Sequence, residues 1–272
     1  MSESRHRKKR QQKFLEMNPI CCFCGGINSA NTIDHVPPQA CFPEGYVPEN
    51  FESPACKACN EETTKEDQIF GLYSLLLNFD ESQMGRQEDI EKILKLKQGI
   101  INNYPDALPD DTKAHPIHRV GSIIAPAPVA ISVPTTQSAK KALRVTCRKL
   151  THALYFRETG KIMTSTHQFL SSSYQPQLDG TQNLTSLFAS LLPNQIVGKR
   201  SNIKEYGDRF RYLSGYKEVE DFFVYAAQFG HGIILWGVVC GPGVEKPSSG
   251  PLSHAHWLSG ACGAGANASS TG

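Results

Sequence analysis

Residues 21–60 read CCFCGGINSANTIDHVPPQACFPEGYVPENFESPACKACN, and this stretch decides the N-terminal fold. It contains two Cys-x-x-Cys pairs, Cys21 with Cys24 and Cys56 with Cys59. Each pair forms a tight knuckle, and two knuckles supply the tetrahedral sulfur set that zinc prefers in structural sites. Zinc binding in such peptides contributes about 10–16 kcal/mol at neutral pH. We therefore expect a structural zinc ion to order a segment that has too few apolar residues for a core of its own.

The other cysteines carry less information. Cys22 is an alternative ligand in the first knuckle, but neighbouring residues point in different directions, so Cys21 with Cys24 makes the better pair. The remaining cysteines have no partner at ligand spacing, and we expect them to be small apolar or surface residues: Cys41, Cys147, Cys240 and Cys262.

Polar residues between and after the knuckles distinguish this segment from an ordinary zinc ribbon. Asp34 and His35 are adjacent and follow a β-like start, and Asn50 precedes the second knuckle. Asn60 follows Cys59 directly, where a helix is expected to begin, so it could also serve as a helix cap. A bare four-cysteine site usually only stabilises a fold, whereas this combination indicates a chemical role.

In order and spacing, these residues resemble the HNH, or ββα-metal, endonuclease family. The similarity covers residues 20 to about 70 and is closest to bacterial HNH-domain proteins of mostly uncharacterised type. Many members have histidine at the last signature position, where this chain has Asn60. The asparagine variant occurs among HNH nucleases, so the difference does not exclude activity.

The resemblance implies a role for each signature residue. His35 would be the general base that takes a proton from the attacking water. Asp34 and Asn60 would hold a catalytic divalent cation, Mg²⁺ or Mn²⁺, and Asn50 would brace the loop that presents His35. The four cysteines would hold the structural zinc, and the substrate would be DNA.

Charge is distributed unevenly along the chain. Residues 1–13 carry six Lys or Arg against one Glu, whereas residues 14–70 carry two Lys against nine acids. A DNA-binding module is not expected to be so acidic, so bound cations and other basic parts of the chain would have to compensate. Residues 1–13 are either a solvated tail or an arm that contacts phosphates.

The composition is that of an ordinary globular protein. The longest apolar stretches are too short for a membrane-spanning helix, and the basic start lacks the apolar core of a secretory signal. We therefore expect a cytoplasmic protein with no membrane partner, in which clustered cysteines bind metal rather than form disulfides. The sequence does not indicate the oligomeric state.

Apolar periodicity outlines the remaining parts of the chain. It predicts a helix from about Glu61, a second over 87–102, a Pro-rich extended connector over 103–136 and a basic amphipathic helix over 138–156 that stops near Gly160. The predicted strands are 196–203, 209–216, 222–229 and 232–240, and short turns indicate that the last three form an antiparallel meander.

We expect an α+β protein on this basis. Its predicted parts are a basic arm (1–13), a zinc-stapled, treble-clef-like ββα-metal module (14–75), a helical and Pro-rich connector (76–136), a C-terminal α+β region (137–240) and a disordered tail (241–272).

Two rival functions compete with the nuclease. The first is a zinc-containing module that binds nucleic acid without catalysis, suggested by the basic arm and the basic helix from Lys140 to Arg157. The second is a structural zinc module for protein–protein contact, suggested by the acidic charge of residues 14–70.

Overall fold

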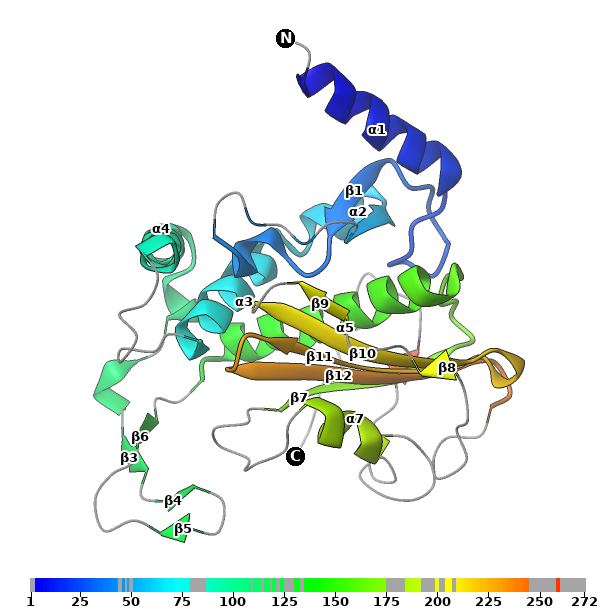
Figure 1. The fold of residues 1–272 in the computed structure, drawn as a ribbon. Helices are drawn as coiled ribbons and strands as arrows, with labels where there is room; N and C mark the ends of the chain where they lie inside the picture. The colour runs from blue at the N-terminus through cyan, green and yellow to red at the C-terminus, as the bar shows by residue number, and fades with distance from the viewer. Residues whose placement is uncertain are drawn as a thin grey trace.

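The computed structural model shows an α+β fold in which helices surround an antiparallel sheet (Figure 1). The structure describes residues 3–43, 46, 48, 51–78, 87–108, 110–113, 115–117, 119–120, 123–124, 130–132, 135–174, 184–191, 199–200, 204–206, 209–244 and 258–259.

The N-terminal module contains a two-stranded hairpin followed by two helices: β1 (Thr32–His35), β2 (Glu52–Ala55), α2 (Lys57–Glu61) and α3 (Thr64–Leu77). The hairpin is antiparallel, with Asp34 opposite Ser53 and His35 opposite Glu52. An isolated bridge between Ile20 and Ser29 closes the loop of the first knuckle. Between the strands lies a single 3₁₀ turn, η1 (Gln39–Cys41).

The C-terminal region is built on a seven-stranded sheet: β7 (Gln168–Tyr174), β8 (Lys199–Arg200), β9 (Lys204–Tyr206), β10 (Phe210–Lys217), β11 (Phe222–Phe229), β12 (Ile233–Cys240) and β13 (Leu258–Ser259). The strand order is β13-β7-β12-β11-β10-β8, and β9 also pairs with β10. Consecutive strands β10, β11 and β12 are antiparallel neighbours, so the predicted meander is confirmed.

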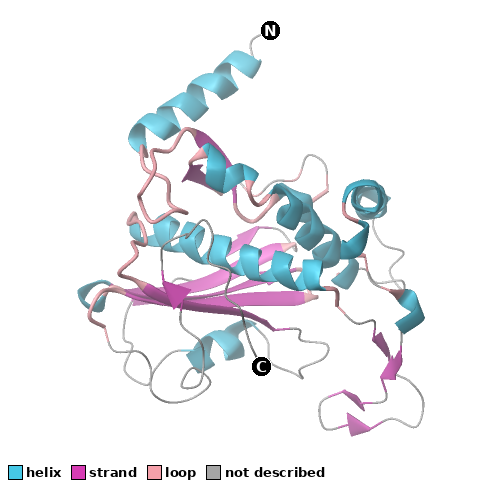
Figure 2. Ribbon diagram, turned by 180° about the vertical axis from the view of Figure 1, so that it is seen from behind, coloured by secondary structure: helices cyan, strands magenta, loops and turns pink. Residues whose placement is uncertain are grey.

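Helix α5 (Gln137–Thr159) lies between the sheet and the N-terminal module, as Figures 1 and 2 both show. Thr136 caps its start by accepting a hydrogen bond from the Ala139 backbone, and Gly160 ends it with a left-handed φ of 70°. A shorter helix, α7 (Leu184–Leu191), covers the opposite face of the sheet.

Side chains of β11 alternate between two apolar clusters. Phe223 and Tyr225 face the cluster that includes α5 and the two Cys-x-x-Cys knuckles, whereas Phe222 and Val224 face the cluster that includes α7. Successive residues of a strand point to opposite faces, so a strand covered on both faces reads as a continuous apolar run. The first cluster extends from Cys21 to Val239, so the N-terminal module and the sheet share one core.

The structure adds detail to two segments of residues 1–136. The basic arm is helical: α1 (Glu3–Met17) projects from the body of the molecule and approaches it at β1 (Figure 1). The described residues of the Pro-rich connector, predicted to be extended, include two small antiparallel strand pairs. Helix α4 (Gln87–Asn103) precedes this connector, as the sequence predicts. The described elements of the connector are η3 (Pro105–Ala107), η4 (Asp111–Lys113), β3 (His115–Ile117), β4 (Arg119–Val120), β5 (Ile123–Ile124) and β6 (Ala130–Ser132).

Further differences concern the C-terminal region. Of the predicted strand 196–203, the described residues 199–200 form strand β8, and strand β7 was not predicted. The prediction that residues 241–272 are disordered is wrong at Leu258 and Ser259, which pair with β7. Residues 245–257 and 260–272 lie outside the described residues. A short 3₁₀ turn, η5 (Glu218–Glu220), connects β10 to β11.

Candidate functional site

Four cysteines gather at the junction of the first knuckle and α2. The sulfur atoms of Cys21, Cys24, Cys56 and Cys59 all lie within 4.8 Å of one another. A tetrahedral zinc site with Zn–S bonds of about 2.3 Å requires sulfur separations of about 3.8 Å, so the four thiols fit such an ion. The cluster can therefore hold a metal ion such as zinc.

Hydrogen bonds prepare this cluster for a cation. The Asn28 backbone donates to Cys24 Sγ at 3.3 Å, and the Asn28 side chain donates to Cys56 Sγ at 3.7 Å. A hydrogen bond with Cys59 and further backbone bonds lower the pKa of Cys21 to about 4, against the effect of burial. Since the thiolate is the form that binds metal, these contacts favour metal binding.

Cys22 is not part of the cluster. It is almost completely buried, and burial raises the pKa of its thiol. Its carbonyl accepts a hydrogen bond from His152 Nδ1 on α5, with a distance of 3.0 Å. Cys22 therefore anchors the first knuckle to α5. The first knuckle contributes Cys21 and Cys24, and not Cys22, to the four-cysteine cluster.

Asp34 and His35 lie on opposite faces of the hairpin, because successive strand residues alternate. The Asp34 carboxylate faces α5, where it meets Lys149. His35 shares the other face with its cross-strand partner Glu52, which forms an ion pair with Arg10 of α1 at 3.0 Å. The expected base and the expected metal ligand are thus presented in different directions.

Lys149 connects the Asp34 carboxylate to α3. Its ammonium lies 2.8 Å from Asp34 Oδ2 and 2.8 Å from Asp67 Oδ2, and it donates to Thr63 Oγ1 at 2.9 Å. The Lys149 and Asp34 side chains are 4% and 7% exposed, so solvent barely screens this pair. Burial would lower the pKa of Lys149, but Asp34 and Asp67 outweigh burial and raise it. The lysine is therefore charged and sits between two acids.

Asn60 lies on the Asp34 side of β1. Its amide Nδ2 donates to Thr32 Oγ1 at 3.2 Å and to the Ile33 carbonyl at 3.3 Å. Thr32 and Asp34 are two residues apart in one strand and share a face. These bonds tie α2 to β1. Asn60 therefore stabilises the packing of α2 against β1, whether or not it also binds a metal ion.

Asn50 lies outside the described residues. Its neighbour Phe51 is buried and packs under the guanidinium of Arg157, whose carbon lies 4.3 Å from the ring centre. Arg157 also donates to Tyr206 and Tyr212 on the sheet. The end of α5 thus fixes the chain that leads into β2.

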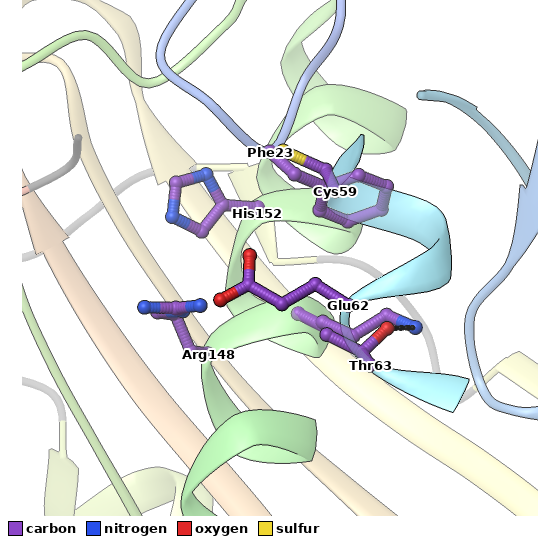
Figure 3. Close-up of a pocket in the computed structure, with 7 residues that line it drawn as sticks. Phe23, Cys59, Glu62, Thr63, Arg148 and His152 are labelled. Carbon is purple, nitrogen blue, oxygen red and sulfur yellow. Dashed lines mark hydrogen bonds between the residues drawn. The ribbon is translucent and has the colours of Figure 1, made fainter. Parts of the chain in front are cut away.

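A catalytic divalent cation does not fit the Asp34 site in this arrangement. The Lys149 ammonium occupies the space in front of the carboxylate. The neighbouring cavity, lined by Phe23, Cys59, Glu62, Thr63, Arg148, Lys149 and His152, measures about 10 Å³ (Figure 3). That volume holds about one water molecule, whereas Mg²⁺ usually keeps several waters.

No protein-family model, curated protein or solved structure matches this chain. Within the described ranges, no helix is long and apolar enough to cross a membrane.

Sequence reasoning missed Lys149, Thr63 and His152 as members of the site. Lys149 was assigned to a basic helix face that would meet nucleic acid, but it is buried. One signal was available: Lys149 falls in a stripe with Ala142, Thr146 and Ala153, which is the spacing of a buried helix face. A lysine within such a stripe requires an acid partner from elsewhere in the fold.

Proposed function

We propose that this protein is an HNH-type endonuclease that hydrolyses DNA phosphodiester bonds. One observation carries the proposal: the Asn60 amide, directly after the four-cysteine cluster, bonds the strand that bears Asp34 and His35. A purely structural zinc knuckle needs no such acid–histidine–asparagine combination. The arrangement of hairpin, cysteines and helix supports the proposal.

His35 would act as the general base. It would take a proton from a water molecule, which attacks the phosphorus atom while the bond to the leaving sugar oxygen breaks. An imidazole with an ordinary pKa of about 6.5 is suited to this task at neutral pH. His35 is half-buried on the hairpin face beside Glu52 and α1, so the phosphate would approach from that side.

Helix α1 would supply the basic surface that the acidic module lacks. Lys8, Lys9, Arg10 and Lys13 are exposed on it, and Arg10 reaches Glu52 opposite His35. Lysine and arginine at this position would contact phosphates on either side of the scissile bond.

The Mg²⁺ or Mn²⁺ ion expected from the resemblance can bind at Asp34 only under one condition. Lys149 must leave Asp34 before an ion can bind there, since one carboxylate oxygen cannot accept both at the same position. The structure with Lys149 on Asp34 would then be a closed form. The structural zinc at the four cysteines is independent of this condition.

The alternative function is a zinc-containing module that binds nucleic acid or protein without catalysis. The Asp34–Lys149 ion pair favours it, because a buried lysine on the expected metal ligand is also what a purely structural site would contain. Salt-dependent DNA binding without cleavage in any divalent cation would support this alternative.

A supercoiled-plasmid assay on full-length protein of known zinc content tests the proposal. Reactions would contain Mg²⁺, Mn²⁺ or a chelator, and nicked, linear and supercoiled DNA would be quantified. We expect cation-dependent nicking. A zinc-loaded protein that retards DNA in gels but leaves every plasmid intact would favour the non-catalytic alternative.

A further inference from the structure

Helix α5 keeps three cations that the fold does not use. Lys140, Arg144 and Arg148 form no ion pair with any residue that the structure describes, whereas the other cations between Gln137 and Thr159 pair with acids: Lys141, Lys149 and Arg157. Lys140 and Arg144 are exposed, and Arg148 is half-buried. Successive members are four residues apart, so they lie on one side of the helix. We call these three residues the α5 stripe.

The α5 stripe has no acid within its own helix surface. The sequence from Gln137 to Arg157 contains no Asp or Glu. Glu62 lines the same small cavity as Arg148, but the two side chains form no ion pair there (Figure 3). Like charges that gather on one face create a positive potential, which attracts an anionic partner. Charge therefore favours an anionic ligand for this surface.

The length of the α5 stripe selects among anionic ligands. An α-helix rises about 1.5 Å per residue, so the three cations extend along about 12 Å of the helix axis. One strand of duplex DNA presents a phosphate about every 3.4 Å along its axis, so about three or four phosphates occupy the same length. The long side chains of lysine and arginine can adjust to these positions. A small anion would engage only part of the stripe, whereas a phosphodiester backbone can engage all of it.

Strand β7 adds hydroxyl groups on the α5 side of the sheet. The strand packs against the helix, with 5.6 Å between the ring centres of Phe169 and His152. Side chains alternate along a strand, so Ser171 and Ser173 share the face of Phe169. Both serines are half-buried, so part of each side chain reaches solvent. Serine hydroxyls, like lysine and arginine, are common donors to phosphate oxygens.

We propose that the α5 stripe binds the sugar–phosphate backbone of a nucleic acid and recognises its charge, not its base sequence. This surface is separate from α1, so the protein contacts its nucleic acid at two elements. The inference rests on the proposed function for DNA as the ligand, but binding is measurable without cleavage.

The test is fluorescence anisotropy of a short labelled DNA duplex with full-length, zinc-loaded protein and no added divalent cation. Lys140→Gln/Arg144→Gln/Arg148→Gln should bind at least about tenfold more weakly than wild type at low salt. The slope of log affinity against log salt concentration should fall by about 3, since each phosphate contact contributes about 0.9.

Lys95→Gln/Lys97→Gln/Lys113→Gln is the matched control, because it removes three exposed charges from α4 and η4. It should keep the wild-type slope. Arg144→Lys/Arg148→Lys preserves both charges and should bind nearly as wild type does. If the triple α5 variant folds poorly, Lys140→Gln/Arg144→Gln changes only exposed positions and should lower the slope by about 2.

Three outcomes decide the matter. Equal losses in the α5 variant and the control overturn the inference, because they report net charge alone. Unchanged DNA binding by the α5 variant, with weaker binding to polyglutamate, overturns it in favour of an acidic protein partner. Stripe-dependent DNA binding by a protein that never nicks plasmid would support this inference and refute the nuclease.

Discussion

Lys149 of α5 and Asp34 of β1 form a buried ion pair, with 2.8 Å between Nζ and Oδ2. The pair joins the N-terminal module to the C-terminal region, and Asp67 shares the same ammonium. Removal of one partner leaves the other charge buried and uncompensated, which is the costly case for ion pairs.

Lys149→Ala should therefore lower the free energy of unfolding by about 3–5 kcal/mol. Lys140→Ala is the control, because Lys140 is exposed on the same helix and its loss should change stability by less than about 0.5 kcal/mol. Chemical denaturation of the zinc-loaded proteins measures both. Equal stability of the two variants would show that the buried pair contributes nothing.

Zinc binding should require the four clustered cysteines and should not require Cys22. Cys56→Ser should lose the bound zinc, and circular dichroism and protease sensitivity should report unfolding of residues 20–62. Cys22→Ala should keep about one zinc per chain, since its thiol lies outside the cluster. Zinc retained by Cys56→Ser, or lost from Cys22→Ala, would disprove this ligand set.

Glycine at position 71 should be required where α3 crosses η1. A Cβ placed there would lie 2.5 Å from the Ala40 Cβ and 2.7 Å from the Ala40 backbone, so Gly71→Ala should cost about 1–3 kcal/mol. Gly99→Ala on α4 is the control, because a Cβ at Gly99 meets nothing within 4 Å. That control should stabilise the protein by about 0.5–1 kcal/mol. Thermal unfolding measures the stability of both variants. A Gly71→Ala protein as stable as wild type would rule out the close approach of α3 to Ala40.

Stability should fall in mild acid because of His152. Burial lowers the pKa of His152 to about 4 from its ordinary value of about 6.5, despite the hydrogen bond to Cys22. The unfolded chain therefore takes up this proton first, so the stability that His152 contributes is present above pH 6.5 and lost as the pH falls toward 4. Between pH 7 and pH 5 the loss should be about 2 kcal/mol.

His152→Asn isolates the effect of protonating His152, because the asparagine amide can still donate a hydrogen bond to the Cys22 carbonyl. The difference in unfolding free energy between pH 7 and pH 5 should be about 2 kcal/mol smaller in His152→Asn than in wild type. Acid-induced loss of zinc affects both proteins and cancels in the comparison. His6→Asn, which alters an exposed histidine, should behave as wild type. Identical pH profiles for His152→Asn and wild type would contradict the assignment.

Local spacing was enough to predict the parts of the fold that short-range chemistry determines. The Cys-x-x-Cys pairs identified the metal cluster, the apolar run 222–229 identified β11, and Gly160 marked the end of α5. Each of these signals depends on neighbours within a few residues. Strand β7, by contrast, contains three consecutive serines and gains its place only by pairing with β12.

Long-range contacts explain what sequence reasoning could not find in the site. Lys149 was read as a solvated or nucleic-acid-binding charge, and only the packing of α5 against β1 and α3 shows its acid partners. Lys141 and Arg157 are similarly engaged, with Glu66 and with Tyr212. The basic face expected of α5 is therefore partly used within the fold, and α1 becomes the stronger candidate for phosphate contact.

The most direct measurement of the central claim is the nicking rate of His35→Ala against wild type, both zinc-loaded and assayed on supercoiled plasmid with Mn²⁺. His231→Ala is the matched control, since His231 lies at the β11–β12 turn, away from the hairpin. We predict that wild type and His231→Ala nick the plasmid equally, and that His35→Ala is slower by about 10²–10⁴-fold with its zinc retained. Nicking by His35→Ala at the wild-type rate would contradict the claim that this strand carries the chemistry.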